Sequence, residues 1–65
     1  MNQIDKSTDK QEAINIAKEK SIKENTIYYV ILSKGEYYVD TSDFVRVWES
    51  LICIVENGKY KNEEL

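Results

Sequence analysis

The chain has 65 residues and a formal net charge of −3, with no histidine and a single cysteine. A chain of this length forms one domain and buries only about 60% of the surface that its unfolded form exposes, so its stability margin is small. One cysteine excludes an internal disulfide, and one thiol without histidine argues against a structural zinc site. We expect a single domain over residues 1–65, without metal or cofactor, that gains stability from self-association or a partner.

Charges of both signs are mixed along the chain, which is typical of a soluble surface and argues against membrane or nucleic-acid binding. No segment approaches the roughly 20 apolar residues that span a membrane. Residues 1–6 lack the apolar core of a secretion signal. Without a disulfide framework either, we expect a cytoplasmic protein.

A helix is expected over residues 8–24. Thr8 is the expected N-cap, and Gln11 completes a capping box. Small and apolar residues share one side of this segment at helical spacing: Ala13, Ile14, Ile16, Ala17 and Ser21. Asn25 is the expected left-handed residue beyond the C-terminus. The polar residues 1–7 are expected to fray.

Two β-prone runs, residues 26–32 and 36–40, flank Lys34-Gly35 and predict a hairpin. Pairing Ser33 with Glu36 divides the apolar side chains between two sides. One side carries Tyr28, Val30, Leu32, Tyr37 and Val39, and the other carries Tyr29, Ile31 and Tyr38. A half-solvated sheet normally alternates apolar and polar residues, and neither side here is polar. Which side meets the helix stays open.

Residues 42–49 are ambiguous, because Ser42 could cap a short helical turn whereas the valines favour a strand. We favour a helical turn or an irregular corner. Residues 51–55 predict a third strand. Asn57-Gly58 is a strong hairpin signal that would return residues 59–61 as a short edge strand. Residues 62–65 are expected to form a frayed tail.

The predicted fold class is therefore α+β: one N-terminal helix packed on a three- to four-stranded antiparallel sheet, in the order α-β-β-β. One helix covers one face of such a sheet. Part of the opposite face would stay apolar, and exposed apolar patches mark interaction sites.

Catalytic signals are weak. Nucleophile–base pairs usually need histidine, which is absent. Cys53 lies in an apolar run and is expected to be a small buried hydrophobe. Two carboxylate pairs are available, Asp40 with Asp43 and Glu49 with Glu56, and they are more simply interpreted as capping or surface residues. Neither glycine belongs to a phosphate-binding loop. We expect a protein that is not an enzyme.

Candidate partner-binding residues come from the sheet and the segment after it. Trp, Tyr and Arg dominate binding hot spots, and the acidic residues could meet a basic channel. The candidates are Tyr28, Tyr29, Tyr37, Tyr38, Asp40, Asp43, Arg46 and Trp48. Alternatively, half of the tyrosines are core and Trp48 is the largest core side chain. Base stacking on the tyrosines is a third interpretation, and the acidic net charge argues against it.

In size, acidity, lack of catalytic residues and lysine-rich composition, the chain resembles the small inhibitors encoded by phages and other mobile elements, including anti-CRISPR and related anti-defence proteins. The resemblance covers general character and no motif, so it assigns no residues. It implies a non-catalytic protein that occludes a surface of a host nuclease or defence protein. The alternative is a structural or regulatory homodimer, or an accessory subunit.

Overall fold

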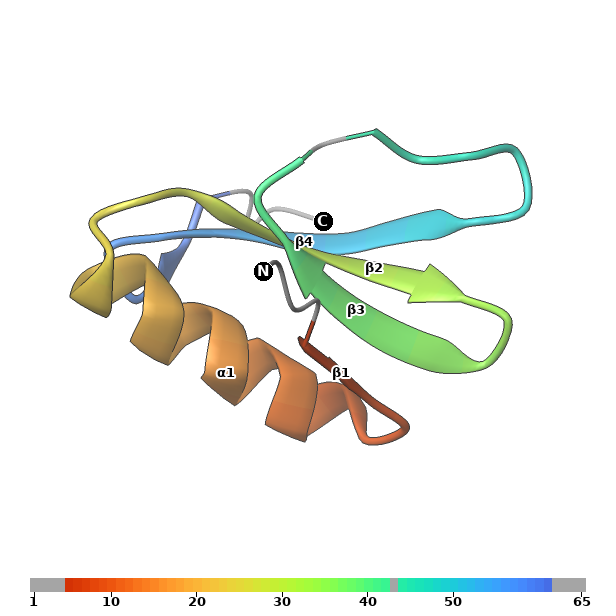
Figure 1. Ribbon diagram of the computed structural model, residues 1–65, viewed down its shortest axis with the longest axis horizontal. Helices are drawn as coiled ribbons and strands as arrows, with labels where there is room; N and C mark the ends of the chain where they lie inside the picture. The colour runs from red at the N-terminus through yellow and green to blue at the C-terminus, as the bar shows by residue number, and fades with distance from the viewer. Residues whose placement is uncertain (1–4, 43, 62–65) are drawn as a thin grey trace.

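The computed structural model describes residues 5–42 and 44–61, in which one helix packs against a five-stranded antiparallel sheet (Figure 1). The predicted α+β class, with a helix on an antiparallel sheet, is confirmed. The elements in chain order are β1 (Asp5–Ser7), α1 (Lys10–Lys23), β2 (Tyr28–Ser33), β3 (Glu36–Asp40), β4 (Ser50–Glu56) and β5 (Lys59–Tyr60). The strand order is β1-β3-β2-β4-β5, so β2 lies at the centre of the sheet.

The sheet has more strands than expected, because the chain forms a strand before the helix. Residues 5–7 were expected to fray, and this prediction is wrong: β1 pairs with β3, with Asp5 opposite Val39. Lys20 of the helix lies 3.1 Å from the Asp5 carboxylate. A polar strand of this kind is stabilised by its neighbour's edge and this ion pair, not by an apolar pattern of its own. The remaining residues expected to fray, 1–4 and 62–65, lie outside the described residues.

The helix begins later than predicted. Asp9, not Thr8, is the N-cap, and its carboxylate accepts a hydrogen bond from the Gln11 amide at 3.1 Å. The chain leaves β1 at Ser7 and must turn before the helix can start, which moves the cap to Asp9. At the other end Asn25 has a φ of 53°, as predicted for the residue beyond the C-terminus. The amides of Asn25 and Thr26 close a Schellman motif on the last turn.

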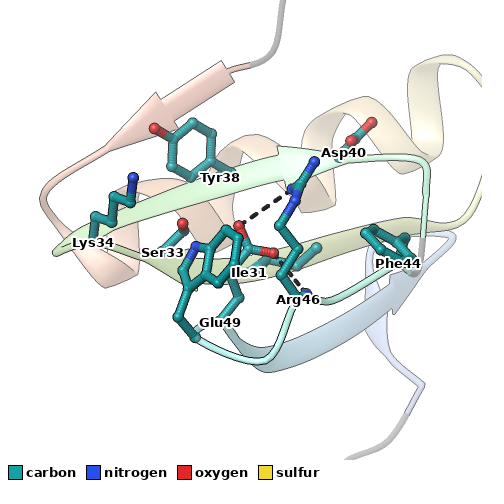
Figure 2. Close-up of a pocket in the computed structure, with 9 residues that line it drawn as sticks. Ile31, Ser33, Lys34, Tyr38, Asp40, Phe44, Arg46 and Glu49 are labelled. Atoms are coloured by element: carbon teal, nitrogen blue, oxygen red, sulfur yellow. Dashed lines mark hydrogen bonds and ion pairs between the residues drawn. The ribbon is translucent and has the colours of Figure 1, made fainter.

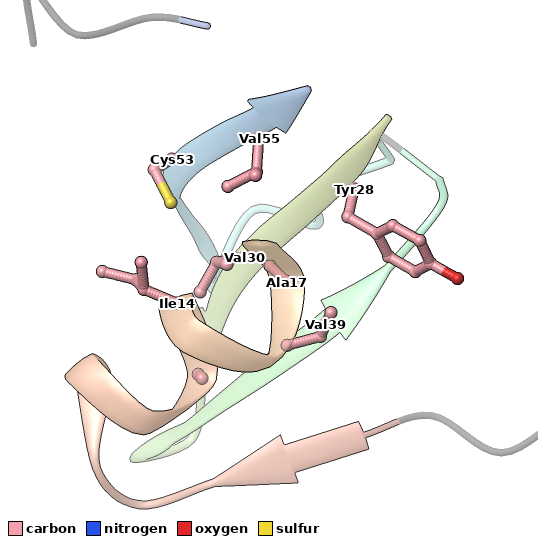
Figure 3. Close-up of a cluster of buried hydrophobic side chains, with 8 residues drawn as sticks. Ile14, Ala17, Tyr28, Val30, Val39, Cys53 and Val55 are labelled. Atoms are coloured by element: carbon pink, nitrogen blue, oxygen red, sulfur yellow. The ribbon is translucent and has the colours of Figure 1, made fainter. Parts of the chain in front are cut away.

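The core lies between α1 and the sheet side that carries Val30 and Val39 (Figure 3). This answers the question that the sequence left open. Small residues on the helix let it approach the sheet closely. The buried apolar residues are Ala13, Ile14, Ala17, Tyr28, Val30, Val39, Cys53 and Val55, joined by the buried Ile31 on the other face. Burial raises the pKa of the Cys53 thiol, and its predicted role as a small buried hydrophobe is confirmed.

Both hairpins form at the predicted turns. Ser33 pairs with Glu36 and Val30 with Val39, as the register predicted. The turn residues Lys34 and Gly35 both have positive φ, which a type I′ turn requires. Asn57 and Gly58 repeat this geometry and return the chain as the short edge strand β5.

The second of these turns is attached to the end of the helix. Ser21 is fully buried, and its hydroxyl accepts the Gly58 amide at 2.7 Å and donates to the Lys18 carbonyl at 2.8 Å. A Cβ atom on Gly58 would lie 2.6 Å from Cδ1 of Ile22. The Lys18 ammonium also lies 4.7 Å from the centre of the Tyr60 ring. The helix therefore holds both the turn and β5.

The two glycines allow a matched test of this contact. Gly35 and Gly58 have φ values of 82° and 79°, but a Cβ on Gly35 would meet nothing within 4 Å. We expect Gly35→Ala to lower the free energy of unfolding by about 1 kcal/mol through backbone strain alone. Gly58→Ala should cost up to about 1 kcal/mol more, because the exposed Ile22 side chain must also change its rotamer. Urea denaturation of both variants measures the difference, and equal losses would contradict the close contact between turn and helix.

Candidate functional site

The face of the sheet opposite α1, called the outer face below, carries a mixture of apolar and polar side chains. Ile31 and Ser33 project from β2, and Tyr38 and Asp40 project from β3 (Figure 2). They share this face because successive strand residues point to opposite sides. Together they form the floor of a pocket with a volume of about 370 Å³.

The chain between β3 and β4 crosses the outer face and forms the wall of this pocket (Figures 1 and 2). Its described residues, 41–42 and 44–49, contain no helix or strand, and Val47 and Trp48 form a turn. The expected irregular corner is therefore correct and the expected helical turn is wrong. Valine side chains at positions 45 and 47 disfavour a helix, because β-branched residues lose rotamer freedom there.

A reciprocal contact between Arg46 and Glu49, called the Arg46–Glu49 clamp below, closes this turn. The Glu49 amide donates to the Arg46 carbonyl at 2.9 Å, and the Arg46 amide donates to the Glu49 carboxylate at 3.0 Å. The Arg46 guanidinium lies 3.6 Å from the second carboxylate oxygen. The Arg46 amide and the ion pair therefore both depend on the Glu49 side chain, and a backbone hydrogen bond closes the turn beside them.

The Glu49 carboxylate is well shielded, with 10% of its side chain exposed. The Arg46 amide, and then the Ser33 hydroxyl, stabilise its ionised form, and they hold the pKa of Glu49 below its usual value of 4.5. Ser33 belongs to the floor of the pocket. Glu49 therefore attaches the turn to the sheet as well as closing it.

Cations and aromatic rings alternate around the pocket. The Arg46 guanidinium lies 5.4 Å from the centre of the Phe44 ring and 5.9 Å from that of Trp48. The Lys34 ammonium lies 5.9 Å from the Trp48 ring. Lys34 and Asp40 lie at opposite ends of the pocket, with Tyr38 between them and Phe44 on the Asp40 side (Figure 2).

The turn and the residues just before it expose large apolar side chains. Phe44 is 64% exposed, Val47 98% and Trp48 57%. The interpretation of Trp48 as the largest core residue is therefore wrong. The space against α1 is filled by valines, Ile14 and Tyr28, and Trp48 belongs to a turn on the far side of the sheet.

The structure brings together four of the predicted partner-binding residues, all of which line the pocket: Tyr38, Asp40, Arg46 and Trp48. Tyr29 is half-buried and pairs with Asp40 and Ile54 on the outer face, but does not line the pocket. Tyr28 belongs to the core and Tyr37 packs against it, so they are not on the candidate surface. Asp43 lies outside the described residues.

Five residues that line the pocket were not among the candidate partner-binding residues: Ile31, Ser33, Lys34, Phe44 and Glu49. Lys34 was interpreted as a turn residue near the tyrosines of the base-stacking interpretation, and Phe44 lay in the ambiguous segment 42–49. The signal in the sequence that could have indicated the turn was the spacing of Arg46 and Glu49. Opposite charges three residues apart can pair across a turn as well as along a helix, and the two valines favour the turn.

The pocket is suited to non-covalent binding. Its aromatic faces can stack and its cations can meet carboxylates. In residues 5–42 and 44–61, no three His, Cys, Asp or Glu side chains are placed to hold a metal ion. Within the same residues, no helix is long and apolar enough to cross a membrane.

Comparison with protein-family models, with curated proteins and with solved structures finds no match to this chain. The geometry of the outer face is therefore the basis for inferring the function.

The Arg46–Glu49 clamp should open in acid. A depressed pKa in the fold means that Glu49 contributes stability above its usual pKa of 4.5, and that this contribution is lost as the pH falls through the lower, folded pKa. Trp48 is the only tryptophan, so its fluorescence reports on the turn directly. We expect the emission to change as the pH falls below 4.5.

Glu49→Gln is the matched control for this titration, because it keeps the shape of the side chain and removes its charge. The variant should show the open-turn emission at neutral pH and should lack the acid transition. An unchanged acid transition in the variant would show that another group controls the turn.

Proposed function

We propose that this protein is a non-catalytic binding module that acts by covering a surface of another protein. The observation that carries the proposal is the exposure of Phe44, Val47 and Trp48 on a turn that the Arg46–Glu49 clamp holds closed. These three residues, with Arg46 and Lys34 beside them, are called the docking surface below.

The composition of the turn supports this proposal. Central turn positions are usually occupied by Gly, Asn, Asp, Ser or Pro, because these residues suit the backbone. Here Val47 and Trp48 occupy them, and the 98% exposed Val47 gains almost nothing from burial in the fold. Trp, Arg and Tyr are enriched in binding hot spots. A turn already closed by its own contacts also loses less conformational entropy when it binds.

An inhibitor that occludes a surface of a host nuclease or defence protein is the specific form of this proposal, and cytoplasmic action is part of it. The small size, the net charge of −3 and the absence of histidine support it. Steric occlusion is a better explanation than phosphate mimicry. The docking surface carries Lys34 and Arg46, and these cations would repel a basic nucleic-acid channel.

A single-strand nucleic-acid binder is the second candidate. The pocket joins Trp48, Tyr38 and two cations, which is the combination that stacks bases. Glu49 and Asp40 lie in the same pocket and reduce the local positive charge. A titration of Trp48 fluorescence with oligonucleotide at low salt separates the two candidates, and no response eliminates the second.

Affinity capture from the native host tests the leading proposal. The parent chain should enrich one protein, and purified preparations of the two should then bind directly. Trp48→Ala should weaken that binding by about 30-fold, since a hot-spot side chain contributes about 2 kcal/mol. Tyr60→Ala is the matched control, because Tyr60 is exposed but lies on β5, outside the docking surface. Equal binding by the two variants would contradict the assignment of the surface.

A further inference from the structure

We infer that a second copy of this chain docks on the outer face, across a two-fold axis that lies in the interface over Tyr38 and perpendicular to β3. The inference goes beyond the proposed function and does not require it. The inference is based on the order of charged and aromatic side chains along the pocket. A two-fold rotation places each of these side chains opposite a complementary one on the second copy.

The charges provide the first argument. Lys34 precedes β3 and Asp40 ends it, so they lie at opposite ends of the pocket with Tyr38 between them (Figure 2). A two-fold rotation about an axis perpendicular to β3 exchanges the two ends of the strand. It therefore places Lys34 of each copy opposite Asp40 of the other, and forms two equivalent ion pairs.

The other ion pairs of this face are already made within one chain. Arg46 pairs with Glu49, and Lys6 lies 3.5 Å from the Glu36 carboxylate. Among residues 5–42 and 44–61, neither Lys34 nor Asp40 has an ion-pair partner, and Asp40 accepts only the neighbouring Thr41 amide. The two charged groups without an ion-pair partner, at opposite ends of the pocket, therefore have opposite signs. An isologous contact through these ends requires this arrangement.

The aromatic residues follow the same order. Trp48 lies beside Lys34, and Phe44 lies on the Asp40 side of the pocket. The rotation that matches the charges also brings Trp48 of each copy toward Phe44 of the other. Both rings are more than half exposed in the single chain, so this contact would bury apolar area and pair aromatic rings.

Self-association also has a consequence for a partner that uses the docking surface. The second copy and the partner would compete for Trp48 and Phe44. Dilution or excess partner would then release the docking surface, and the dimer would protect it from non-specific contact.

Solution mass of the purified chain, measured by sedimentation from micromolar to millimolar concentration, tests the inference without any partner. We expect a reversible monomer–dimer equilibrium, with Trp48 emission shifting to the blue as the dimer forms. Lys34→Glu should raise the dimer dissociation constant at least about tenfold, because it puts like charges opposite each other twice. Lys10→Glu on α1 makes the same change in net charge away from the outer face, and should leave the equilibrium unchanged.

The decisive step is to mix two single variants. Lys34→Glu alone and Asp40→Lys alone should each be largely monomeric. Their mixture should form a heterodimer, because both contacts then join opposite charges. The double variant, which keeps the parent net charge of −3, should recover the dimer. A monomeric parent chain at every concentration would overturn the inference, and so would a mixture that stays monomeric while circular dichroism shows folded variants.

Discussion

The Arg46–Glu49 clamp determines what the outer face presents. Among residues 5–42 and 44–61, α1 covers one face of the sheet, and the segment between β3 and β4 lies above the other, outer face. The described residues of that segment, 41–42 and 44–49, contain no regular secondary structure to satisfy their backbone. Glu49 supplies the missing contacts, because its carboxylate accepts the Arg46 amide and faces Ser33 in the floor. Without this shielded carboxylate, Trp48 and Phe44 would have no fixed place above Ile31 and Tyr38.

The core of this small protein is limited in area, and yet its only tryptophan lies outside it. A core in which most side chains are alanine or valine is close-packed but limited in area. Burying Trp48 would add more apolar area than any other side chain could. The fold nevertheless places it on the outside, beside Arg46 and Lys34. The proposed contact with a partner protein, or with a second copy, would bury the apolar area that the fold leaves outside the core.

Much of the fold follows from local signals in the sequence. The two glycine-containing turns fix both hairpins, and the first of them fixes the register from Val30 opposite Val39 to Ser33 opposite Glu36. The small side chains of the helix identify its buried side. These features are predictable because each depends on residues close together in the chain.

Other features depend on contacts between distant residues. β1 has a polar sequence and is stabilised by the edge of β3 and by Lys20. The choice of the Val30 side for the helix depends on packing, because both sides of the hairpin are apolar. The position of Trp48 depends on Glu49 reaching both Arg46 and Ser33. The spacing of apolar residues in the sequence does not reveal such a contact. The pattern of residues 44–48 is therefore compatible with a helix, a strand or a turn.

Hydrogen exchange of individual amides, followed by NMR, tests the clamp most directly. The Arg46 and Glu49 amides donate hydrogen bonds within the turn, whereas the Val47 and Trp48 amides have no partner among the described residues. The account predicts slow exchange at Arg46 and Glu49 and fast exchange at Val47 and Trp48. Equally fast exchange at all four positions would show that the turn is not held, and would contradict the account.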